Sequence, residues 1–251
     1  MSSSNREISA KGIILRKTKY SDTSLILDVF TLEFGHITLM AKGVRKQKSK
    51  AIGLLEILNE VDFTLYKNPS SEWHIFKDGE LIKAHLRETK FENGILMQAA
   101  AEIYRQLILE MSDYHKLYEL IVSYLDYIRA IPKNGIAIFW RFLLRMFVII
   151  GIEIDVEKCL ECNKNKSFFA YYPQKHGFIC SACYRPVQSD QLIKLSKQQA
   201  FILNNLRQIG NMLNDFKLDK TMMQKLNRIF LLHLSEHFHK KFYLKSLELL
   251  V

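Results

Sequence analysis

The stretch SLILDVFTLEFGHITLMAK (residues 24–42) consists of two runs in which apolar residues recur at every second position, with a turn that ends at Gly35 between them. A period of two is typical of a strand that buries one face, and a glycine-containing turn between two such runs indicates a hairpin. We therefore predict one strand over residues 24–31 and a second over residues 36–42.

Three further runs of the same kind flank this hairpin, at residues 8–20, 57–66 and 72–86. Five strands within about 80 residues fit a small barrel, and the five-stranded OB-fold is a barrel that binds nucleic acids. An SH3-like barrel is the alternative.

Beyond Glu88 the apolar period changes to three and four residues, which is typical of amphipathic helices. In the last predicted helix apolar side chains recur at every fourth position from Met222 to Phe242, and we interpret this stripe as core. The predicted helices cover residues 96–111, 117–128 and 136–150, with two or three more between residues 196 and 246.

All four cysteines of the chain stand in two CxxC pairs, Cys159 with Cys162 and Cys180 with Cys183, and 17 residues separate the pairs. This spacing is typical of a four-cysteine zinc site, in which protein sulfurs fill every tetrahedral position and the metal is structural. A redox dithiol and an iron–sulfur cluster are the alternatives. We predict one structural Zn²⁺ in a module at about residues 156–187.

Together these patterns predict an α+β chain of two domains. The first, residues 1–84, is a five-stranded OB-fold barrel. The second, residues 85–251, is all-helical and contains the four-cysteine zinc finger as an insertion between helices.

The chain carries 36 basic and 26 acidic residues, a net charge of +10. Such an excess indicates a polyanionic partner, either nucleic acid or an anionic membrane. The N-terminus has no apolar signal region, and the longest apolar run, residues 139–154, is interrupted by Arg141 and Arg145, so we interpret it as a buried helix. We expect a cytoplasmic protein without a membrane partner.

A basic loop follows the predicted hairpin, with five positive charges in nine residues and no acid. A loop of this density is expected to contact phosphates, and three cations near the end of the first strand extend it. The predicted DNA-binding residues are Lys42, Arg45, Lys46, Lys48 and Lys50 of the loop, together with Arg16, Lys17 and Lys19.

Aromatic side chains in the predicted strands could either stack on bases or fill the barrel, and we favour the barrel core for each of them. The acids Glu60 and Asp62 alternate on the fourth predicted strand, and we interpret them as ordinary surface residues. The aromatic residues concerned are Tyr20, Phe63, Tyr66 and Trp73.

The sequence His233-Leu-Ser-Glu-His237 has the H-x-x-E-H spacing of inverted zinc peptidases. A third ligand would be needed well downstream, where few residues remain, so we do not predict a second metal site. No phosphate-binding glycine loop and no nucleophile with a base are recognisable, and we predict that the protein is not an enzyme.

Three segments carry a family resemblance: GIILR at residues 12–16, YSD at 20–22 and FTLEFGHITLMAKGVR at 30–45. They resemble the opening of the bacterial recombination mediator family RecO. The match continues more loosely through DGEL at 78–81 into the cysteine module. One departure is His176-Gly177, where the family usually has two glycines; His176 could line the site without being a ligand.

The resemblance implies an OB-fold joined to a helical domain, and a protein that binds single- and double-stranded DNA and anneals complementary strands. It also implies action with RecR to load RecA onto DNA covered by single-stranded DNA-binding protein, whose acidic C-terminal tail would dock on the helical domain. Residues 81–251 carry 24 basic and 16 acidic residues, which suits such a tail. The alternative is a zinc-containing protein–protein scaffold without direct DNA binding.

Overall fold

The structure is a computed structural model that divides into two compact units, Met1–Ala130 and Ile131–Val251. Each unit has its own buried core. The residues that the structure describes are 6–46, 49–67, 73–107, 113–165, 167–185 and 192–250.

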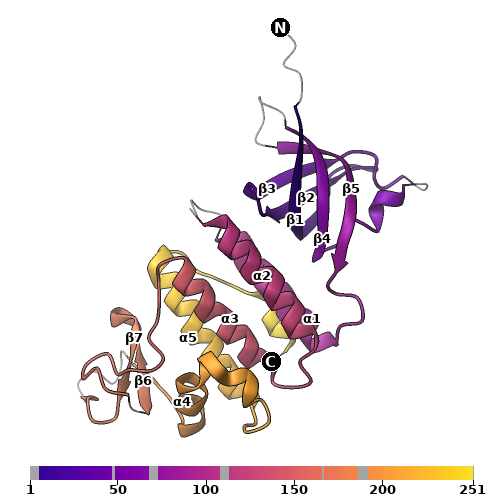
Figure 1. Cartoon of the computed structure of the whole chain (residues 1–251). Helices are drawn as coiled ribbons and strands as arrows, with labels where there is room; N and C mark the ends of the chain where they lie inside the picture. Colours follow the sequence, from indigo (N-terminus) through magenta and orange to yellow (C-terminus); the bar gives the residue numbers. More distant parts are fainter. Residues whose placement is uncertain are drawn as a thin grey trace. The chain divides into compact units, whose positions relative to one another are not determined.

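Five strands of the first unit close into a barrel (Figure 1). Their order around the barrel is β1-β2-β3-β5-β4, and β1 closes the ring by pairing with β4. This OB-like ring confirms the predicted N-terminal fold. The strands are β1 (Arg6–Lys19), β2 (Leu25–Thr31), β3 (Gly35–Ala41), β4 (Asn59–Lys67) and β5 (Trp73–Ala84).

The pair β3–β5 is parallel, whereas β1–β2, β2–β3, β1–β4 and β4–β5 are antiparallel. A parallel pair needs a long connection. Here that connection contains the basic loop, a short 3-10 helix η1 (Lys50–Ile52) and β4. The barrel topology therefore leaves room for the basic loop between β3 and β4.

The barrel interior is filled by alternate side chains from all five strands, as the period of two predicted. Gly12 in β1 leaves room for this packing, because a Cβ atom there would lie 2.6 Å from Cγ1 of Val29. The buried cluster includes Ala10, Ile14, Leu27, Val29, Leu39, Val61, Phe63, Leu65 and Phe76.

Two helices, α1 (Phe91–Gln106) and α2 (Tyr114–Arg129), belong to the same unit as the barrel. The ring of Tyr104 on α1 meets that of Phe30 on β2 edge to face, with centroids 5.0 Å apart. The hydroxyl of Tyr104 donates to the carbonyl of Leu117 on α2 at 2.7 Å. Aromatic packing and this hydrogen bond therefore link both helices to the barrel.

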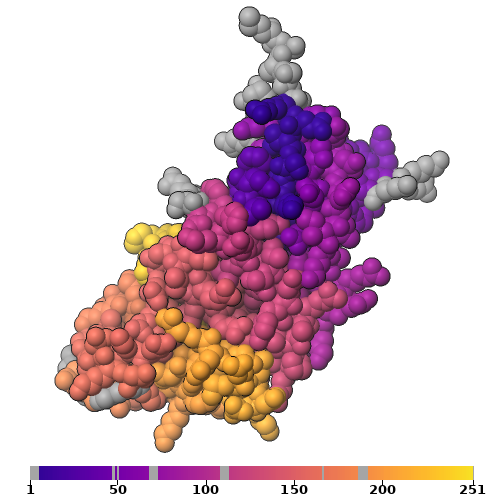
Figure 2. All heavy atoms as spheres, in the orientation of Figure 1, coloured from indigo at the N-terminus to yellow at the C-terminus, as the bar shows by residue number. Residues whose placement is uncertain are grey.

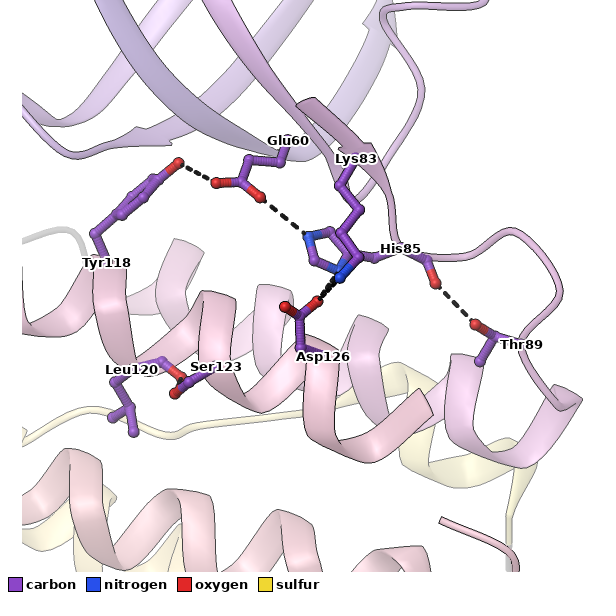
Figure 3. Close-up of polar contacts among 8 residues, drawn as sticks. All are labelled: Glu60, Lys83, His85, Thr89, Tyr118, Leu120, Ser123 and Asp126. Carbon is purple, nitrogen blue, oxygen red and sulfur yellow. Dashed lines mark hydrogen bonds and ion pairs between the residues drawn. The ribbon is translucent and has the colours of Figure 1, made fainter. Parts of the chain in front are cut away.

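A buried polar network also joins α2 to the barrel (Figure 3). Nε2 of His85 lies 3.5 Å from a carboxylate oxygen of Glu60, and its Nδ1 lies 3.2 Å from Asp126 on α2. Tyr118 donates its hydroxyl to Glu60 at 2.9 Å. The interpretation of Glu60 as a surface residue is wrong: its side chain is turned toward α2 and buried there.

The described residues of the second unit form three α-helices and a small three-stranded sheet; Figure 1 shows their arrangement. Among the described helices, none combines the length and the apolarity that crossing a membrane requires. The elements are α3 (Gly135–Ile149), β6 (Phe168–Tyr172), η2 (Pro173–Lys175), β7 (Gly177–Cys180), β8 (Ile193–Lys194), α4 (Lys197–Asn204), η4 (Leu206–Asn211), α5 (Lys220–Phe238) and η5 (Lys245–Leu249).

The core of this unit lies between α3 and α5. Trp140 on α3 stacks on Phe230 of α5 with ring centroids 6.4 Å apart, and its Nε1 donates to Oδ1 of Asn227 at 2.7 Å. The predicted helix through Phe242 is too long, since α5 ends at Phe238. Phe242 is nevertheless buried, because the chain folds back after the helix.

Candidate functional site

The four cysteines come together at the base of the β6–β7 hairpin. Their sulfur atoms all lie within 4.8 Å of one another, and the Sγ atoms of Cys162 and Cys180 are 4.0 Å apart. Four sulfurs at about 2.3 Å from a tetrahedral zinc ion are separated by about 3.8 Å. The spacing of the thiols therefore fits a single zinc ion.

Backbone groups favour one thiolate in this cluster. Although burial opposes ionisation, N–H groups of Cys162, Cys180 and Glu161 lower the pKa of Cys159 to about 6. Burial and a contact with Cys180 raise the pKa of Cys183 to about 12. A metal must therefore displace the proton of the Cys183 thiol, because the ligand is the thiolate.

The cysteine module has its own aromatic packing. Phe168 on β6 stacks on Phe178 of β7 with centroids 4.8 Å apart, and β8 pairs with the outer edge of β6. The module follows α3 and precedes α4 in the chain, as predicted. Figure 2 shows its surface, in salmon, next to the orange surface of the α4 and η4 segment.

The basic loop packs against the turn between β1 and β2. The backbone N–H of Arg45 donates to the carbonyl of Thr23 at 3.0 Å, and its guanidinium donates to the carbonyl of Ser21 at 2.7 Å. Lys42 and Lys46 of the same loop are exposed. Arg45 thus holds the loop, while the two lysines face solvent.

The other predicted DNA-binding residues differ in their surroundings. Arg16 and Lys19 on β1 are exposed, whereas Lys17 forms an ion pair with Glu56. Lys48 lies outside the described residues, and so does the side chain of Lys50.

Two aromatic residues beside the loop are exposed. Tyr20 is 60% exposed and Trp73 is 39% exposed, and their rings meet edge to face with centroids 6.4 Å apart. The interpretation of Tyr20 and Trp73 as core residues is wrong, whereas Phe63 is fully buried in the barrel. Tyr20 immediately precedes the turn that Arg45 contacts, so this pair exposes two aromatic rings next to the basic loop.

A cavity of about 420 Å³ opens in the second unit between α3 and η4. Three guanidinium groups and three apolar side chains line it, and Glu153 forms an ion pair with Arg207 at 3.1 Å. This combination suits a short ligand with carboxylates and an apolar group. The lining residues are Arg141, Leu144, Arg145, Val148, Glu153, Ile154 and Arg207.

Two family models match the chain in succession. "Recombination protein O N terminal" matches residues 1–85, and "Recombination protein O C terminal" matches residues 89–248. The chain belongs to the RecO family. The resemblance seen in residues 12–45 is thereby confirmed over nearly the whole sequence.

Relatives named "DNA repair protein RecO" agree with this assignment. The protein of Chloroherpeton thalassium is 31% identical over 62% of this chain, and that of Listeria monocytogenes is 25% identical over 80%. The matched region spans 61% of the Chloroherpeton protein but 95% of the protein of Chlorobium phaeobacteroides, which is 26% identical over 93% of this chain.

RecO is a family of DNA repair and recombination proteins that act as mediators and not as enzymes. The family assignment therefore confirms the prediction that the protein is not an enzyme. The structure brings the four cysteines together and places the described cations of the basic loop at one turn of the barrel. It adds the exposed pair Tyr20–Trp73 and the arginine-lined cavity, which periodicity could not reveal.

Proposed function

We propose that this RecO chain binds single- and double-stranded DNA and anneals complementary strands in the bacterial cytoplasm. With RecR, it helps to load RecA onto DNA covered by single-stranded DNA-binding protein. The observation that carries the DNA-binding part is the placement of exposed Lys42 and Lys46 on a loop fixed to the turn beside the exposed Tyr20–Trp73 pair.

The proposed mechanism needs no covalent step. Cations of the loop and of β1 neutralise phosphates on two strands at once, which lowers their mutual repulsion and lets base pairing nucleate. Aromatic rings stack on bases irrespective of sequence, so an exposed pair beside the cations suits strands of any sequence. Arg16, Lys19, Arg45, Lys48 and Lys50 complete the proposed contacts, while Lys17 must first leave Glu56.

The charge distribution supports a second anionic partner. The barrel unit, residues 1–130, has 18 basic and 17 acidic residues, whereas residues 131–251 have 18 basic and 9 acidic residues. Almost the whole net charge of +10 therefore belongs to the second unit. Its field favours polyanions, either DNA or an acidic protein segment.

We assign the arginine-lined cavity to the C-terminal tail of single-stranded DNA-binding protein. The guanidinium group of Arg145 can bind a carboxylate in a bidentate manner, and that of Arg207 can do so once it leaves Glu153 and Glu157. Leu144, Val148 and Ile154 suit an apolar end residue. The test is binding of a labelled acidic tail peptide to Arg145→Ala. Arg228→Ala, an exposed arginine on α5 outside the cavity, is the control. Equal loss of affinity in both variants, or in neither, would refute the assignment.

We further propose that the four cysteines hold one structural Zn²⁺. The geometry of the sulfurs supports this, and a site with four protein ligands has no position left for a reactive water. Cys162→Ser should release the ion and unfold the hairpin module, which metal analysis and proton exchange of β6 and β7 amides would measure. An unchanged fold in the metal-free protein would contradict a structural role.

A salt series of oligonucleotide binding and strand annealing tests the DNA-binding proposal. Each neutralised contact to a single strand contributes about 0.7 to the slope of log affinity against log salt. The double variant Lys42→Gln/Lys46→Gln should therefore make the slope shallower by about 1.4 and weaken annealing. Lys77→Gln on β5, where Lys77 pairs with Glu7, is the matched control.

The near-neutral charge of the barrel unit favours one rival, a protein–protein scaffold whose zinc module and helices carry the function. The scaffold hypothesis predicts that the wild-type chain shows no salt-dependent DNA binding. It therefore predicts no difference between Lys42→Gln/Lys46→Gln and Lys77→Gln.

A further inference from the structure

Three histidines of the second unit meet away from the four cysteines. His176 lies in the turn between η2 and β7, while His233 and His237 stand one helical turn apart on α5. One ring nitrogen of each lies within 4.8 Å of those of the other two. The ring centroids of His176 and His237 are 4.1 Å apart, and those of His233 and His237 are 4.4 Å apart.

Backbone carbonyls fix the protonation of the two helical histidines. Nδ1 of His237 lies 2.9 Å from the carbonyl oxygen of His233, and Nε2 of His233 lies 2.7 Å from that of Ile152. A carbonyl oxygen can only accept, so these nitrogens carry the protons. Nε2 of His237 and Nδ1 of His233 therefore keep lone pairs, and Nδ1 of His233 faces the hydroxyl of Tyr171 at 3.2 Å.

This pattern is the one that metal-binding histidines show. Such residues donate the N–H of one nitrogen to a carbonyl or carboxylate, which orients the other nitrogen toward the ion. Nδ1 of His176 is buried and has no hydrogen-bond partner among the residues that the structure describes. A buried nitrogen without a partner is rare and needs an explanation, and an ion would supply one.

The imidazoles are also in the form that a metal requires. Burial lowers the pKa of His233 to about 4, and burial together with the neighbouring His237 lowers that of His176. Both rings are therefore neutral near pH 7, and no proton has to leave them before an ion binds.

We propose that His176, His233 and His237 form a second metal site, which takes a divalent transition-metal ion such as Zn²⁺ through three imidazole nitrogens. Zinc–nitrogen bonds of about 2.1 Å imply nitrogen–nitrogen separations of about 3.4 Å, so nitrogens that lie within 4.8 Å of one another must approach by no more than about 1.4 Å. His176 and His237 are partly exposed, which leaves them room to move. Tyr171 gives up its hydrogen bond to His233 when the ion binds.

The site would join the cysteine-bearing hairpin to the helical core. His176 belongs to the same hairpin as Cys180, whereas the other two ligands belong to the core helix α5. An ion shared between them would fix the cysteine module to the helical core. Because the cluster has three ligands among the residues that the structure describes, the fourth position would remain open to water, unlike that of the four-cysteine site.

Metal titration of the full chain tests the proposal. Chelator-treated protein is titrated with Zn²⁺ under native mass spectrometry and with Co²⁺ under absorption spectroscopy. We expect two ions per chain, with a thiolate-to-cobalt charge-transfer band from one of them only. His176→Asn, in which asparagine suits the left-handed backbone at φ 53°, should retain the thiolate-bound ion and lose the other.

His237→Gln should behave like His176→Asn, with the second affinity reduced by more than the 10- to 100-fold that loss of an outer-sphere partner causes. His115→Gln, an exposed histidine on α2, is the control and should bind two ions. One ion per wild-type chain, or a second ion that persists in both cluster variants, would overturn the proposal.

A variant that also loses the thiolate-to-cobalt band has an unfolded cysteine module. In that case NMR of the wild-type protein tests the histidine site. The ¹⁵N resonances of Nδ1 of His233 and Nε2 of His237 should shift with the second equivalent of Zn²⁺. Unchanged histidine resonances at two equivalents would refute the site.

Discussion

Tyr118 on α2 donates its hydroxyl to a carboxylate oxygen of Glu60 on β4, with 2.9 Å between the two oxygens. Both residues are buried, so this bond and the His85 contacts replace the water that the carboxylate loses on folding (Figure 3). The network couples the helix to the wall of the barrel. The network accounts for the position of α2 within the barrel unit. The sequence placed the domain boundary before this helix, between residues 84 and 85, and that boundary stays a prediction.

Removing the hydroxyl should therefore weaken the barrel unit. We expect Tyr118→Phe to lower the free energy of unfolding by about 1–3 kcal/mol, because a buried carboxylate loses a hydrogen-bond donor. Denaturant unfolding would measure this difference. Glu119→Gln on the exposed face of α2 breaks only a surface pair with His115 and should cost about 1 kcal/mol or less. Equal effects of the two changes would contradict the role of the network.

The same network predicts a pH dependence. The contact with His85 lowers the pKa of Glu60 below its ordinary value of 4.5, burial opposes this, and Tyr118 lowers it further. A carboxyl with a depressed folded pKa stabilises the protein fully above its unfolded pKa and loses that contribution as pH falls through the folded value. The stability difference between wild type and Glu60→Gln should thus be constant near neutral pH and shrink below about pH 4.5. A difference that grows on acidification would contradict it.

Gly35, at the turn that the hairpin pattern located, gives a third prediction. Its φ is +64°, and an added Cβ atom would lie 2.5 Å from the ring of Tyr114. We expect Gly35→Ala to destabilise the barrel unit by more than about 1 kcal/mol, because left-handed backbone and the clash both oppose the side chain. Gly53→Ala is the control: its φ is −73° and no atom lies within 4 Å, so it should be neutral or slightly stabilising.

The local patterns of the sequence predicted the elements well, because each depends on neighbours along the chain. The strand period, the turn at Gly35 and the spacing of the cysteine pairs are of this kind. The buried state of Glu60 depends on His85, Tyr118 and Asp126, which are distant in sequence, so no period could reveal it.

The C-terminal half shows the same difference between features that neighbouring residues predict and features that depend on distant residues. The apolar period continues to Phe242 although α5 ends at Phe238, where His239 adopts a left-handed conformation with φ 48°. The apolar period does not reveal that turn, because Phe242 is buried although it lies beyond the end of the helix. The third histidine of the cluster escaped sequence reasoning in a similar way: the search for a partner of His233 looked downstream, and His176 lies upstream in another element.

Trp73 provides the last prediction, because it separates base stacking from charge. The chain has two tryptophans, and the other, Trp140, is fully buried in the second unit. If bases stack on Trp73, single-stranded DNA should quench its fluorescence while that of Trp140 stays constant. Trp73→Ala should then lose the quenching and about 1–3 kcal/mol of binding free energy, with the salt slope unchanged.

Phe91→Ala is the matched control for Trp73→Ala, since Phe91 is 75% exposed at the start of α1, away from the basic loop in the sequence. Its affinity for DNA should equal that of the wild type. Quenching by DNA that persists in Trp73→Ala would mean that the signal comes from Trp140, and therefore from the second unit. Because that unit carries almost all of the net positive charge, such a result would move the main DNA-binding surface there and leave the barrel loop a secondary contact.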